Sequence, residues 1–559
     1  APTIVTTGAV INVEVDETTL SGNDTENFST AFTVNYGADN AGTTAYSLSV
    51  LSVGANSGVV DIATGQAIWL YSEFGGVVGR VGSGGVANSS GAIAFNITVD
   101  SSTGAVTLDQ VRALQHPNAR NPNELINLTN NTVILTATAT DKDGDQNSAS
   151  LNIGNRIGFR DDAPTISSNP GVLGTVQVDE TVLQSNATVS ATDVDFVTNV
   201  FTPNYRADGA ATTNPLVYSL QIASVGVNSG LVDTATGQAI LLYKVGNDVV
   251  GHVGNSSGAE AFRMSLTGDA MTLTQSRAVV HPTTGASHNE PVGLVNGALF
   301  VRAVATDKDG DNVQTQVDVG SRFTFLDDGP AFISASPAPT VDEADLPLGS
   351  SPNAPALTVN GLLNVNFGMD TGAATSRDVR FTIATQTALE AWADNNSNPN
   401  LTASISPDGH TLTALNNGNP AFTVTLAVAA NGAVTYVFTL QGPLTHDYVS
   451  DLTLPFNDLQ IIDGDGDTTI GNFSVIVLDD EPPVPVHKVL IVNEDLTNDG
   501  GFGHGAPDSN TFNTNADATG GVGGNTVIDR QGAPAGTPAT LETGVTVYVN
   551  GIAQTVDAY

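Results

Sequence analysis

Aspartates recur at alternate positions around a glycine at three places in the sequence. The copies are Asp141-Lys142-Asp143-Gly144-Asp145, Asp307-Lys308-Asp309-Gly310-Asp311 and Asp463-Gly464-Asp465-Gly466-Asp467. Carboxylates with this spacing make a poor core and a good cage for a hard cation, since calcium takes about six to eight oxygen ligands in irregular geometry. The sequence therefore predicts that the aspartates of all three copies bind Ca²⁺.

Electrostatic repulsion within each copy supports a bound ion. Three carboxylates about 5 Å apart repel by about 3 kcal/mol per pair at an effective dielectric constant near 20. Lys142 and Lys308 lie inside two copies, but the third has Gly464 at the matching position. The alternative is a solvated acidic turn, because Asp and Gly are common turn residues. Three copies at equivalent places favour the metal site.

Two further acidic motifs accompany each copy. A pair of aspartates followed by a proline lies downstream, and the next unit opens with Val-Asp-Glu or, in the last unit, Val-Asn-Glu. These pairs either cap a strand or bind metal together with the opening acids of the next unit. We predict metal contacts for the paired acids Asp161, Asp162, Asp327, Asp328, Asp479 and Asp480, and for the opening acids Asp179, Glu180, Asp342, Glu343 and Glu494.

Composition limits the function classes. Asp and Glu number 57 against 17 Lys and Arg in 559 residues, a net charge of -40. Such a chain repels nucleic acid and anionic membranes and attracts cations. With 13% charged and 40% apolar residues it does not resemble a disordered acidic tail. Without cysteine, it has neither disulfides nor thiolate sites.

The chain ends carry no processing or membrane signal. No run of about 18 apolar residues predicts a membrane span, and Ala1-Pro2-Thr3 lacks the character of a signal peptide. Thr546 to Gly551 reads as a strand entering a turn close to the last residue. Either a leader was removed or the segment was cut from a longer protein, and the strand so near the last residue favours the second alternative.

The motif spacing divides the chain into four units, which we call repeats 1 to 4. Repeat 1 spans residues 1–162, repeat 2 spans 163–328, repeat 3 spans 329–480 and the incomplete repeat 4 spans 481–559. Repeats 1 and 2 share local sequence, including Arg112 to Pro117 and Arg277 to Pro282, so they should share one fold. Repeat 3 keeps the acidic edges and changes the interior.

Short alternating segments separated by Gly, Asn and Ser predict an all-β fold, a linear array of tandem immunoglobulin-like β-sandwich repeats with calcium at the loops and joins. Strands are expected at residues 11–18, 46–53, 67–71, 95–99 and 132–140, and a hairpin at 422–428 and 433–440. Helix is expected only as a short turn at 109–115 and a short segment at 387–393.

Candidate catalytic features are weak. Gly254-Asn255-Ser256-Ser257-Gly258 matches a nucleophile-elbow pattern but lacks the strand-turn-helix context, so we interpret it as a surface turn. His116 and His281 recur before proline, and we interpret them as buried hydrogen-bonding residues. We predict that the chain is not an enzyme; a hydrolase is the least favoured alternative.

The combination of Val-Asp-Glu, Asp-x-Asp-Gly-Asp and Asp-Asp-x-Pro resembles the tandem repeats of giant bacterial RTX adhesins exported by type I secretion. The resemblance covers residues 1–480, and 481–559 only through its opening. It implies calcium-stiffened extenders that hold a ligand-binding tip away from the cell, with some repeats diverged into binding modules. The sequence departs from whole adhesins in having neither a Gly-Gly-x-Gly-x-Asp array nor a recognisable secretion signal.

We therefore expect a structural extender of a cell-surface adhesin, extracellular or on the bacterial surface, in adhesion or biofilm formation. Its expected partners are neighbouring repeats of the same chain, with no nucleic acid and no membrane insertion. One alternative is a self-assembling fibre or surface-layer subunit in which like chains associate. Another is a carbohydrate- or peptide-binding module in repeat 3 or 4.

Overall fold

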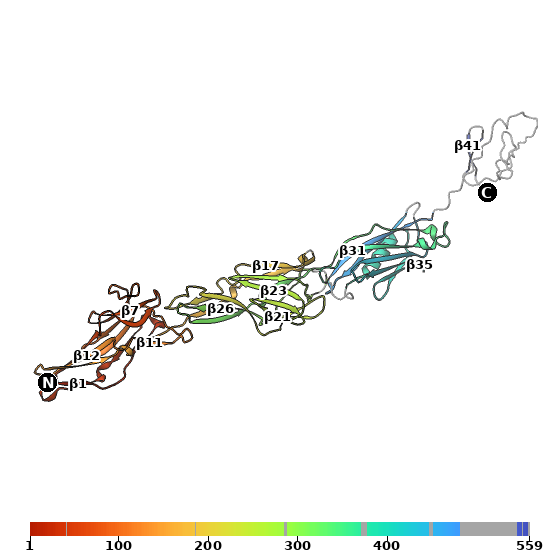
Figure 1. Ribbon diagram of the computed structural model, residues 1–559. Coiled ribbons are helices and arrows are strands. Elements are labelled where there is room, and N and C mark those ends of the chain that lie inside the picture. The colour runs from red at the N-terminus through yellow and green to blue at the C-terminus, as the bar shows by residue number, and fades with distance from the viewer. Residues whose placement is uncertain are drawn as a thin grey trace, which may run out of the picture. The chain divides into compact units, whose positions relative to one another are not determined.

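The computed structural model describes residues 1–480 except 41, 185, 284, 286–287, 371–376 and 447–450, together with two strands near the C-terminus. The expected ligand Glu494 lies outside the described residues. The chain divides into two units, residues 1–341 with 355–478, and residues 342–354 with 479–559. The described residues are nearly all strand, which confirms the all-β class with sheets in a repeated arrangement (Figure 1).

Repeat 1 contains fourteen strands. They are β1 Thr3–Thr6, β2 Val13–Asp16, β3 Asn23–Asn27, β4 Phe32–Asn35, β5 Thr43–Val50, β6 Ala55–Asp61, β7 Gln66–Glu73, β8 Gly76–Val81, β9 Ile93–Val99, β10 Ala105–Gln110, β11 Leu125–Asn127, β12 Val133–Thr140, β13 Gln146–Asn152 and β14 Ile157–Arg160. Their sheet orders are β3-β10-β9-β8-β7-β6, β13-β12-β5, β11-β14-β2 and β1-β4. All five strands expected in this repeat form where the alternation predicts them.

Repeat 2 has the same sheet plan. Its strands are β15 Thr165–Ser168, β16 Val176–Asp179, β17 Val189–Asp193, β18 Phe201–Asn204, β19 Leu216–Ile222, β20 Val227–Val232, β21 Ala239–Val245, β22 Asp248–Val253, β23 Glu260–Thr267, β24 Ala270–Gln275, β25 Pro291–Gly293, β26 Leu299–Thr306, β27 Asn312–Asp318 and β28 Phe323–Leu326. The orders are β17-β24-β23-β22-β21-β20, β19-β26-β27, β16-β28-β25 and β15-β18.

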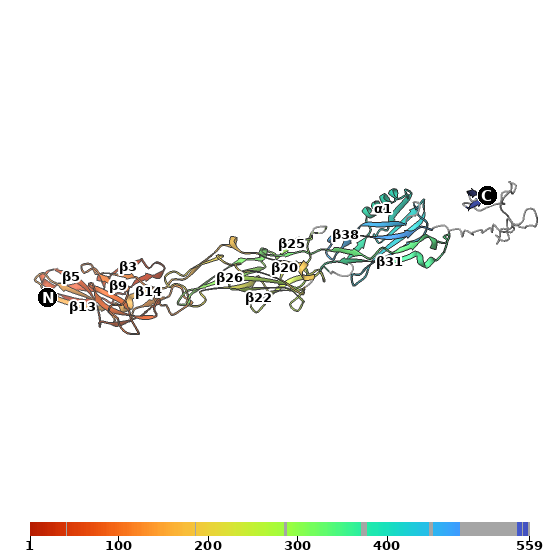
Figure 2. The ribbon, with the colours of Figure 1, turned by 90° about the horizontal axis from the view of Figure 1, so that it is seen from above.

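Repeat 3 builds two larger sheets and one helix. The elements are β29 Ala331–Ala335, β30 Thr340–Asp342, β31 Thr358–Asn366, β32 Asp378–Arg380, α1 Ile383–Asn395, β33 Leu401–Ile405, β34 Thr411–Asn416, β35 Asn419–Val428, β36 Val434–Leu440, β37 Leu452–Ile462 and β38 Thr468–Leu478. The sheet orders are β29-β31-β36-β35-β34-β33 and β30-β38-β37-β32. Helix α1 packs on β37 and β33 (Figure 2).

The helix and hairpin predictions have three outcomes. The segment 387–393 lies within α1, which begins at a capping box formed by Thr382 and Thr385. The hairpin forms as β35 and β36. The prediction of a helical turn at 109–115 is wrong, because Asp109 and Gln110 form the end of strand β10 and pair with β9.

Equivalent aromatic pairs fill the cores of repeats 1 and 2. The ring centroids of Phe95 and Phe159 lie 5.1 Å apart, and those of Phe262 and Phe325 lie 5.3 Å apart. All four side chains are fully buried, and such contacts stabilise a core beyond the area that they bury. They fix β14 and β28, the strands that lead directly into the paired acids.

In repeats 1 and 2, the strand that carries the opening acids pairs in parallel with the last strand of the same repeat. Strand β2 pairs with β14, with Asp16 opposite Arg160, and β16 pairs with β28, with Asp179 opposite Leu326. Parallel strands end at the same edge of a sheet. The opening acids of a repeat therefore lie beside its own closing acids, at one end of the repeat.

The Asp-x-Asp-Gly-Asp motifs are turns between long strands. They connect β12 with β13, β26 with β27, and β37 with β38. In each, the first aspartate's N–H donates to the third aspartate's carbonyl at 3.0–3.1 Å. Gly144, Gly310 and Gly466 have φ of 99°, 113° and 113°, which disfavours residues with a side chain.

The remaining described elements add two findings. Strands β40 Val545–Val549 and β41 Ile552–Val556 pair antiparallel, which confirms the strand expected at 546–550. Within the described part of the chain, no helix is long and apolar enough to cross a membrane.

Candidate metal centres

Two clusters of buried acids form where one repeat meets the next. We define the first join by Glu17, His116, Asp161 and Asp162 of repeat 1 with Asp208, Asp307, Asp309 and Asp311 of repeat 2. The second join comprises Glu180, His281, Asp327 and Asp328 of repeat 2 with Asp370, Asp463, Asp465 and Asp467 of repeat 3. Each join thus draws ligand-type side chains from two repeats.

The aspartate turn of the later repeat reaches the histidine segment of the earlier one. His116 N–H donates to Asp309 Oδ2 at 3.3 Å, and Lys308 Nζ donates to Ala63 O at 2.8 Å. At the second join, His281 N–H donates to Asp465 Oδ2 at 3.2 Å. The turns therefore contact the preceding repeat, as their place between strands permits.

The paired acids form hydrogen bonds with a second loop of the later repeat. Asp162 Oδ2 accepts a hydrogen bond from Ala207 N at 3.2 Å, and Asp328 accepts one from Met369 N at 3.0 Å. These backbone groups directly precede Asp208 and Asp370, whose side chains are buried in the joins.

The opening acids have two separate roles. The carboxylates of Asp179 and Asp342 cap short 3-10 helices, accepting from Thr181 N at 2.9 Å and Ala344 N at 2.8 Å. Glu180 points inward instead, and its Oε1 accepts from Gln275 and from Val279 N. The expectation that Asp179 and Glu180 meet the preceding pair Asp161-Asp162 is wrong, because the parallel pairing carries Glu180 to the second join.

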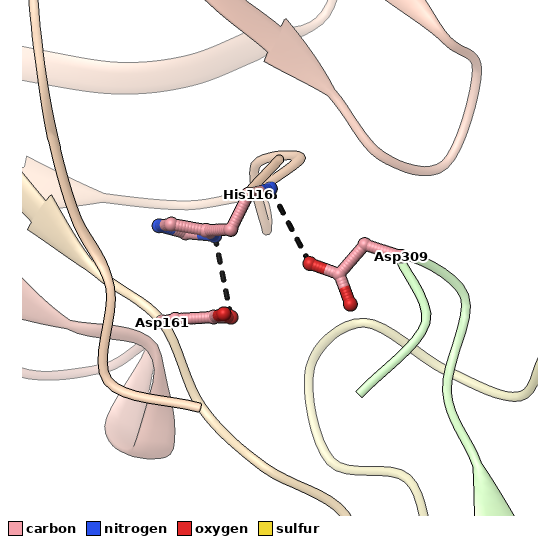
Figure 3. Close-up of side chains that lie close together, drawn as sticks. All are labelled: His116, Asp161 and Asp309. Carbon is pink, nitrogen blue, oxygen red and sulfur yellow. Dashed lines mark hydrogen bonds and ion pairs between the residues drawn. The ribbon is translucent and has the colours of Figure 1, made fainter. Parts of the chain in front are cut away.

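Close packing of ligand atoms is clearest at the second join. One ligand atom each from Glu180, Asp327, Asp328 and Asp370 all lie within 4.8 Å of one another, and all four residues are buried. At the first join, ligand atoms of His116, Asp161 and Asp309 meet the same limit (Figure 3). This geometry matches a cation site with ligands from both sides of the join.

Many carboxylate oxygens in the joins are buried without a hydrogen bond from the described residues. At the first join these are Glu17 Oε2, Asp161 Oδ1, Asp162 Oδ1, both oxygens of Asp208, Asp307 Oδ2, Asp309 Oδ1 and Asp311 Oδ2. At the second they are Glu180 Oε2, both oxygens of Asp327 and Asp370, Asp463 Oδ2 and Asp465 Oδ1. Buried anionic oxygens are costly unless they pair or coordinate metal, so these residues fit a divalent cation.

Burial raises the pKa of these acids. Desolvation brings the pKa of Asp161 and Asp307 to about 8 and that of Asp208 to about 9, with nearby carboxylates adding to the effect. At the second join, desolvation raises the pKa of Asp463 to about 8 and that of Asp370 to about 10. A bound divalent ion would reverse this effect by favouring the ionised carboxylates.

The first copy of the turn forms a separate group. Ligand atoms of Asp39, Asp141 and Asp143 lie within 4.8 Å, and the ammonium of Ala1 lies 3.5 Å from Asp145 and 3.6 Å from Asp141. We call Asp39, Asp141, Asp143 and Asp145 the N-terminal cluster.

Four predicted ligands of repeat 3 fall in the second unit, the opening acids Asp342 and Glu343 and the paired acids Asp479 and Asp480. Within that unit, Asp480 accepts hydrogen bonds from Ser350 N at 3.0 Å and Ser350 Oγ at 2.5 Å. Glu343 follows the capping Asp342 in a 3-10 helix, Glu343–Asp345, and is buried, while Asp479 is half-buried. Metal binding by these four acids stays a prediction.

A family model described as a domain of unknown function (DUF5801) matches residues 12–154 and 175–320, together just over half of the chain. The chain belongs to this family. Each DUF5801 match contains the same order of site residues, an opening glutamate, the histidine and an aspartate turn. The paired acids Asp161-Asp162 and Asp327-Asp328 lie just beyond the matched stretches.

Other comparisons are distant. One similar solved structure is described as a Ca²⁺-stabilised adhesin that helps an Antarctic bacterium reach out and bind ice; identity is 11% over 85% of this chain and 100% of that chain, with a TM-score of 0.19. Another is described as SGBP-B of the Bacteroides ovatus mixed-linkage glucan utilization locus in complex with a mixed-linkage heptasaccharide; identity is 10% over 86% of this chain and 70% of that chain, with a TM-score of 0.11. At these TM-scores neither likeness bears on function. No curated protein matches the chain.

Sequence reasoning missed several acidic residues of the three repeats. Asp39, Asp208 and Asp370 end a recurring motif, Asn-Tyr-Gly-Ala-Asp in repeat 1, Asn-Tyr-Arg-Ala-Asp in repeat 2 and Asn-Phe-Gly-Met-Asp in repeat 3. That recurrence is a signal that could have found them. The surface turn at 254–258 is confirmed between β22 and β23, and the burial of His116 and His281 is confirmed as well.

Proposed function

We propose that this chain is a calcium-stiffened extender segment of a bacterial cell-surface adhesin of the RTX type, exported by type I secretion and acting in adhesion or biofilm formation. Its role is structural rather than enzymatic, and its partners are the neighbouring repeats of the same chain. The observation that carries the proposal is the set of buried carboxylate oxygens without hydrogen bonds, contributed by both repeats at each join.

Calcium suits the joins because their free ligand atoms are mostly carboxylate oxygens. Hard cations prefer such ligands, and calcium tolerates irregular geometry. Asp162, Asp208, Asp307 and Asp311 would hold the ion at the first join, and Asp328, Asp370, Asp463 and Asp467 at the second. Bound calcium supplies positive charge and oxygen coordination there. The N-terminal cluster and the acids Asp342, Glu343, Asp479 and Asp480 are further proposed sites.

Ligands from two repeats would make the ion a clamp. Without calcium, the carboxylates of one repeat repel those of the next, and the joint loosens. With calcium, the same charges hold the repeats together. Extracellular calcium modules commonly bind with Kd of about 10⁻⁴ to 10⁻³ M, so the sites fill outside a cell and empty inside it.

Small-angle scattering and thermal melting of this chain test the proposal. We expect a rigid particle in millimolar calcium, and a flexible particle with a lower melting temperature in excess chelator. Binding to the folded state alone stabilises by about 2.7 kcal/mol when free calcium exceeds Kd by 100-fold. Magnesium at the same concentration is the control for ionic strength. Identical scattering and melting in calcium and chelator would refute the proposal.

A further inference from the structure

Each join also contains a buried imidazole nitrogen that the calcium proposal does not use. The side chains of His116 and His281 are fully buried, and Nδ1 of each makes no hydrogen bond with the described residues. The Nδ1 atoms lie 3.3 Å from Asp161 Oδ1 and 3.1 Å from Asp327 Oδ1. Figure 3 shows the first of these contacts, with Asp309 approaching from another segment.

The other ring nitrogen determines which nitrogen is available to a ligand. His116 Nε2 lies 3.3 Å from Phe159 O, and His281 Nε2 lies 3.2 Å from Phe325 O. A carbonyl oxygen only accepts, so Nε2 carries the proton and donates it. The remaining nitrogen, Nδ1, faces a carboxylate and forms an ion pair with it when the ring is protonated. A metal ion that replaces the Nδ1 proton would bind the lone pair of Nδ1. Metal-binding histidines commonly have this arrangement, with the second nitrogen donating to a backbone carbonyl.

The segments that carry these histidines are firmly positioned. Asp61 forms a two-point ion pair with Arg112 at 2.7 and 3.1 Å, and Asp233 forms the same pair with Arg277 at 2.7 and 2.9 Å. Two residues after each arginine, a backbone N–H donates to the buried glutamate of the join. The imidazole is therefore held in place before any ion arrives.

We propose that each join binds a first-row transition ion such as Zn²⁺ or Mn²⁺ through the histidine Nδ1, beside the calcium. The ligands are His116, Asp161 and Asp309 at the first join, and His281, Asp327 and Glu180 at the second, sets whose ligand atoms lie within 4.8 Å. Calcium takes oxygen ligands, whereas imidazole suits transition ions. The inference rests on the joins being metal centres, as proposed above.

Cobalt(II) reports this site because its visible absorption depends on its ligands. The intact chain, saturated with calcium, is titrated with Co²⁺ and followed by absorption and calorimetry. We expect tight Co²⁺ binding that millimolar calcium does not displace and that Zn²⁺ does. His116→Gln and His281→Gln should each remove one ion per chain. His252→Gln, a half-buried histidine whose Nδ1 contacts Gly258 O at 2.8 Å, is the matched control.

A second measurement uses the unaltered chain, so it holds even if a histidine variant fails to fold. Mn²⁺ bound to the calcium-loaded protein should show nitrogen modulation from imidazole in pulsed electron paramagnetic resonance. No nitrogen signal, or Co²⁺ binding that calcium abolishes, would overturn the inference and leave the histidines as ion-pair partners of Asp161 and Asp327. Calcium-dependent melting is measured separately, so the extender proposal stands or falls independently.

Discussion

The N-terminal cluster and the first join contain the same turn in two surroundings. In both, the first aspartate's N–H donates to the third aspartate's carbonyl at 3.0 Å. The first aspartate is buried in both, with Asp141 4% and Asp307 1% exposed, whereas the third is exposed in the N-terminal cluster, Asp145, and 2% exposed at the first join, Asp311. The contact with repeat 1 therefore removes the third carboxylate from water, while the turn itself already buries the first.

The two surroundings shift pKa values for different reasons. In the N-terminal cluster the hydrogen bond shared by Asp141 and Asp143 lowers the pKa of Asp141 and raises the pKa of Asp143, whereas burial raises the pKa of Asp307 to about 8. Repulsion between neighbouring carboxylates is therefore present in both surroundings, and the contact between two repeats adds the cost of burial to it.

The largest expected effect is a reversal of the pH dependence of stability by calcium. In chelator, Asp307 and Asp161 keep a proton up to about pH 8 in the folded state but lose it near pH 3.8 when unfolded. The contribution of these two groups to stability should therefore be fully present below pH 3.8 and be lost as pH rises through about 8. Calorimetry in chelator across this range measures the fall.

With saturating calcium the trend should invert over the acidic part of the range. Protons then compete with the ion for the same oxygens, so stability rises with pH until the carboxylates are ionised. Melting temperatures that fall with pH equally in calcium and in chelator would show that calcium does not occupy the joins.

A somewhat smaller effect separates the two copies of the turn. Replacing Asp307, Asp309 and Asp311 with Asn should abolish the calcium-dependent stabilisation of the first join, about 2.7 kcal/mol when free calcium exceeds Kd by 100-fold. In chelator above about pH 8, where Asp307 loses its proton, the same variant should be more stable than the parent chain, because the buried repulsion is gone. Calorimetric scans in both conditions give the comparison.

The matched control replaces Asp141, Asp143 and Asp145 with Asn. These groups lie in the N-terminal cluster, outside both joins, so the calcium response of the joins should not change. Equal losses in the two triple variants would mean that calcium acts on the turns and not on the contact between repeats.

The recurring Asn-Tyr-x-Ala-Asp motif provides a single-residue version of the same test. Both oxygens of Asp208 are buried without hydrogen bonds, whereas the side chain of Asp39 is 44% exposed. Asp208→Asn should weaken calcium binding at the first join about tenfold, or about 1.4 kcal/mol, measured by calorimetric titration. If Asp39→Asn weakens that same binding step equally, the assignment of Asp208 to the join is wrong.

The sequence predicts the positions of single strands better than it predicts the contacts between repeats. Strand β12 lies within the expected segment 132–140, because alternation is a local property of half-buried strands. The helix expected at 109–115 fails for a tertiary reason, since Gln110 pairs with Phe95 and its amide donates to Glu17. Neither contact can be recognised from the hydrophobic periodicity of residues 109–115.

Most residues of each candidate site could be predicted from the sequence. The aspartate turns are recognisable because they recur with their glycines. The parallel pairing of β16 with β28 is a long-range property, so sequence reasoning grouped Glu180 with Asp161-Asp162 instead of Asp327-Asp328. Asp208 and Asp370 were missed because a lone aspartate carries no spacing signal, although the motif around it recurs.

The smallest expected difference concerns the glycines of the two turns. Gly144 and Gly310 both have positive φ, so alanine costs about 1–2 kcal/mol of backbone strain at either position. A Cβ at Gly310 would in addition lie 3.0 Å from Ala119 Cβ of repeat 1, whereas nothing lies within 4 Å at Gly144. Gly310→Ala should therefore destabilise the chain by about 1 kcal/mol more than Gly144→Ala, measured by denaturant unfolding in calcium. Equal losses of stability in the two variants would mean that the turn of repeat 2 can move away from repeat 1 at little cost in free energy. A turn that moves so easily would not make the contact between the repeats rigid.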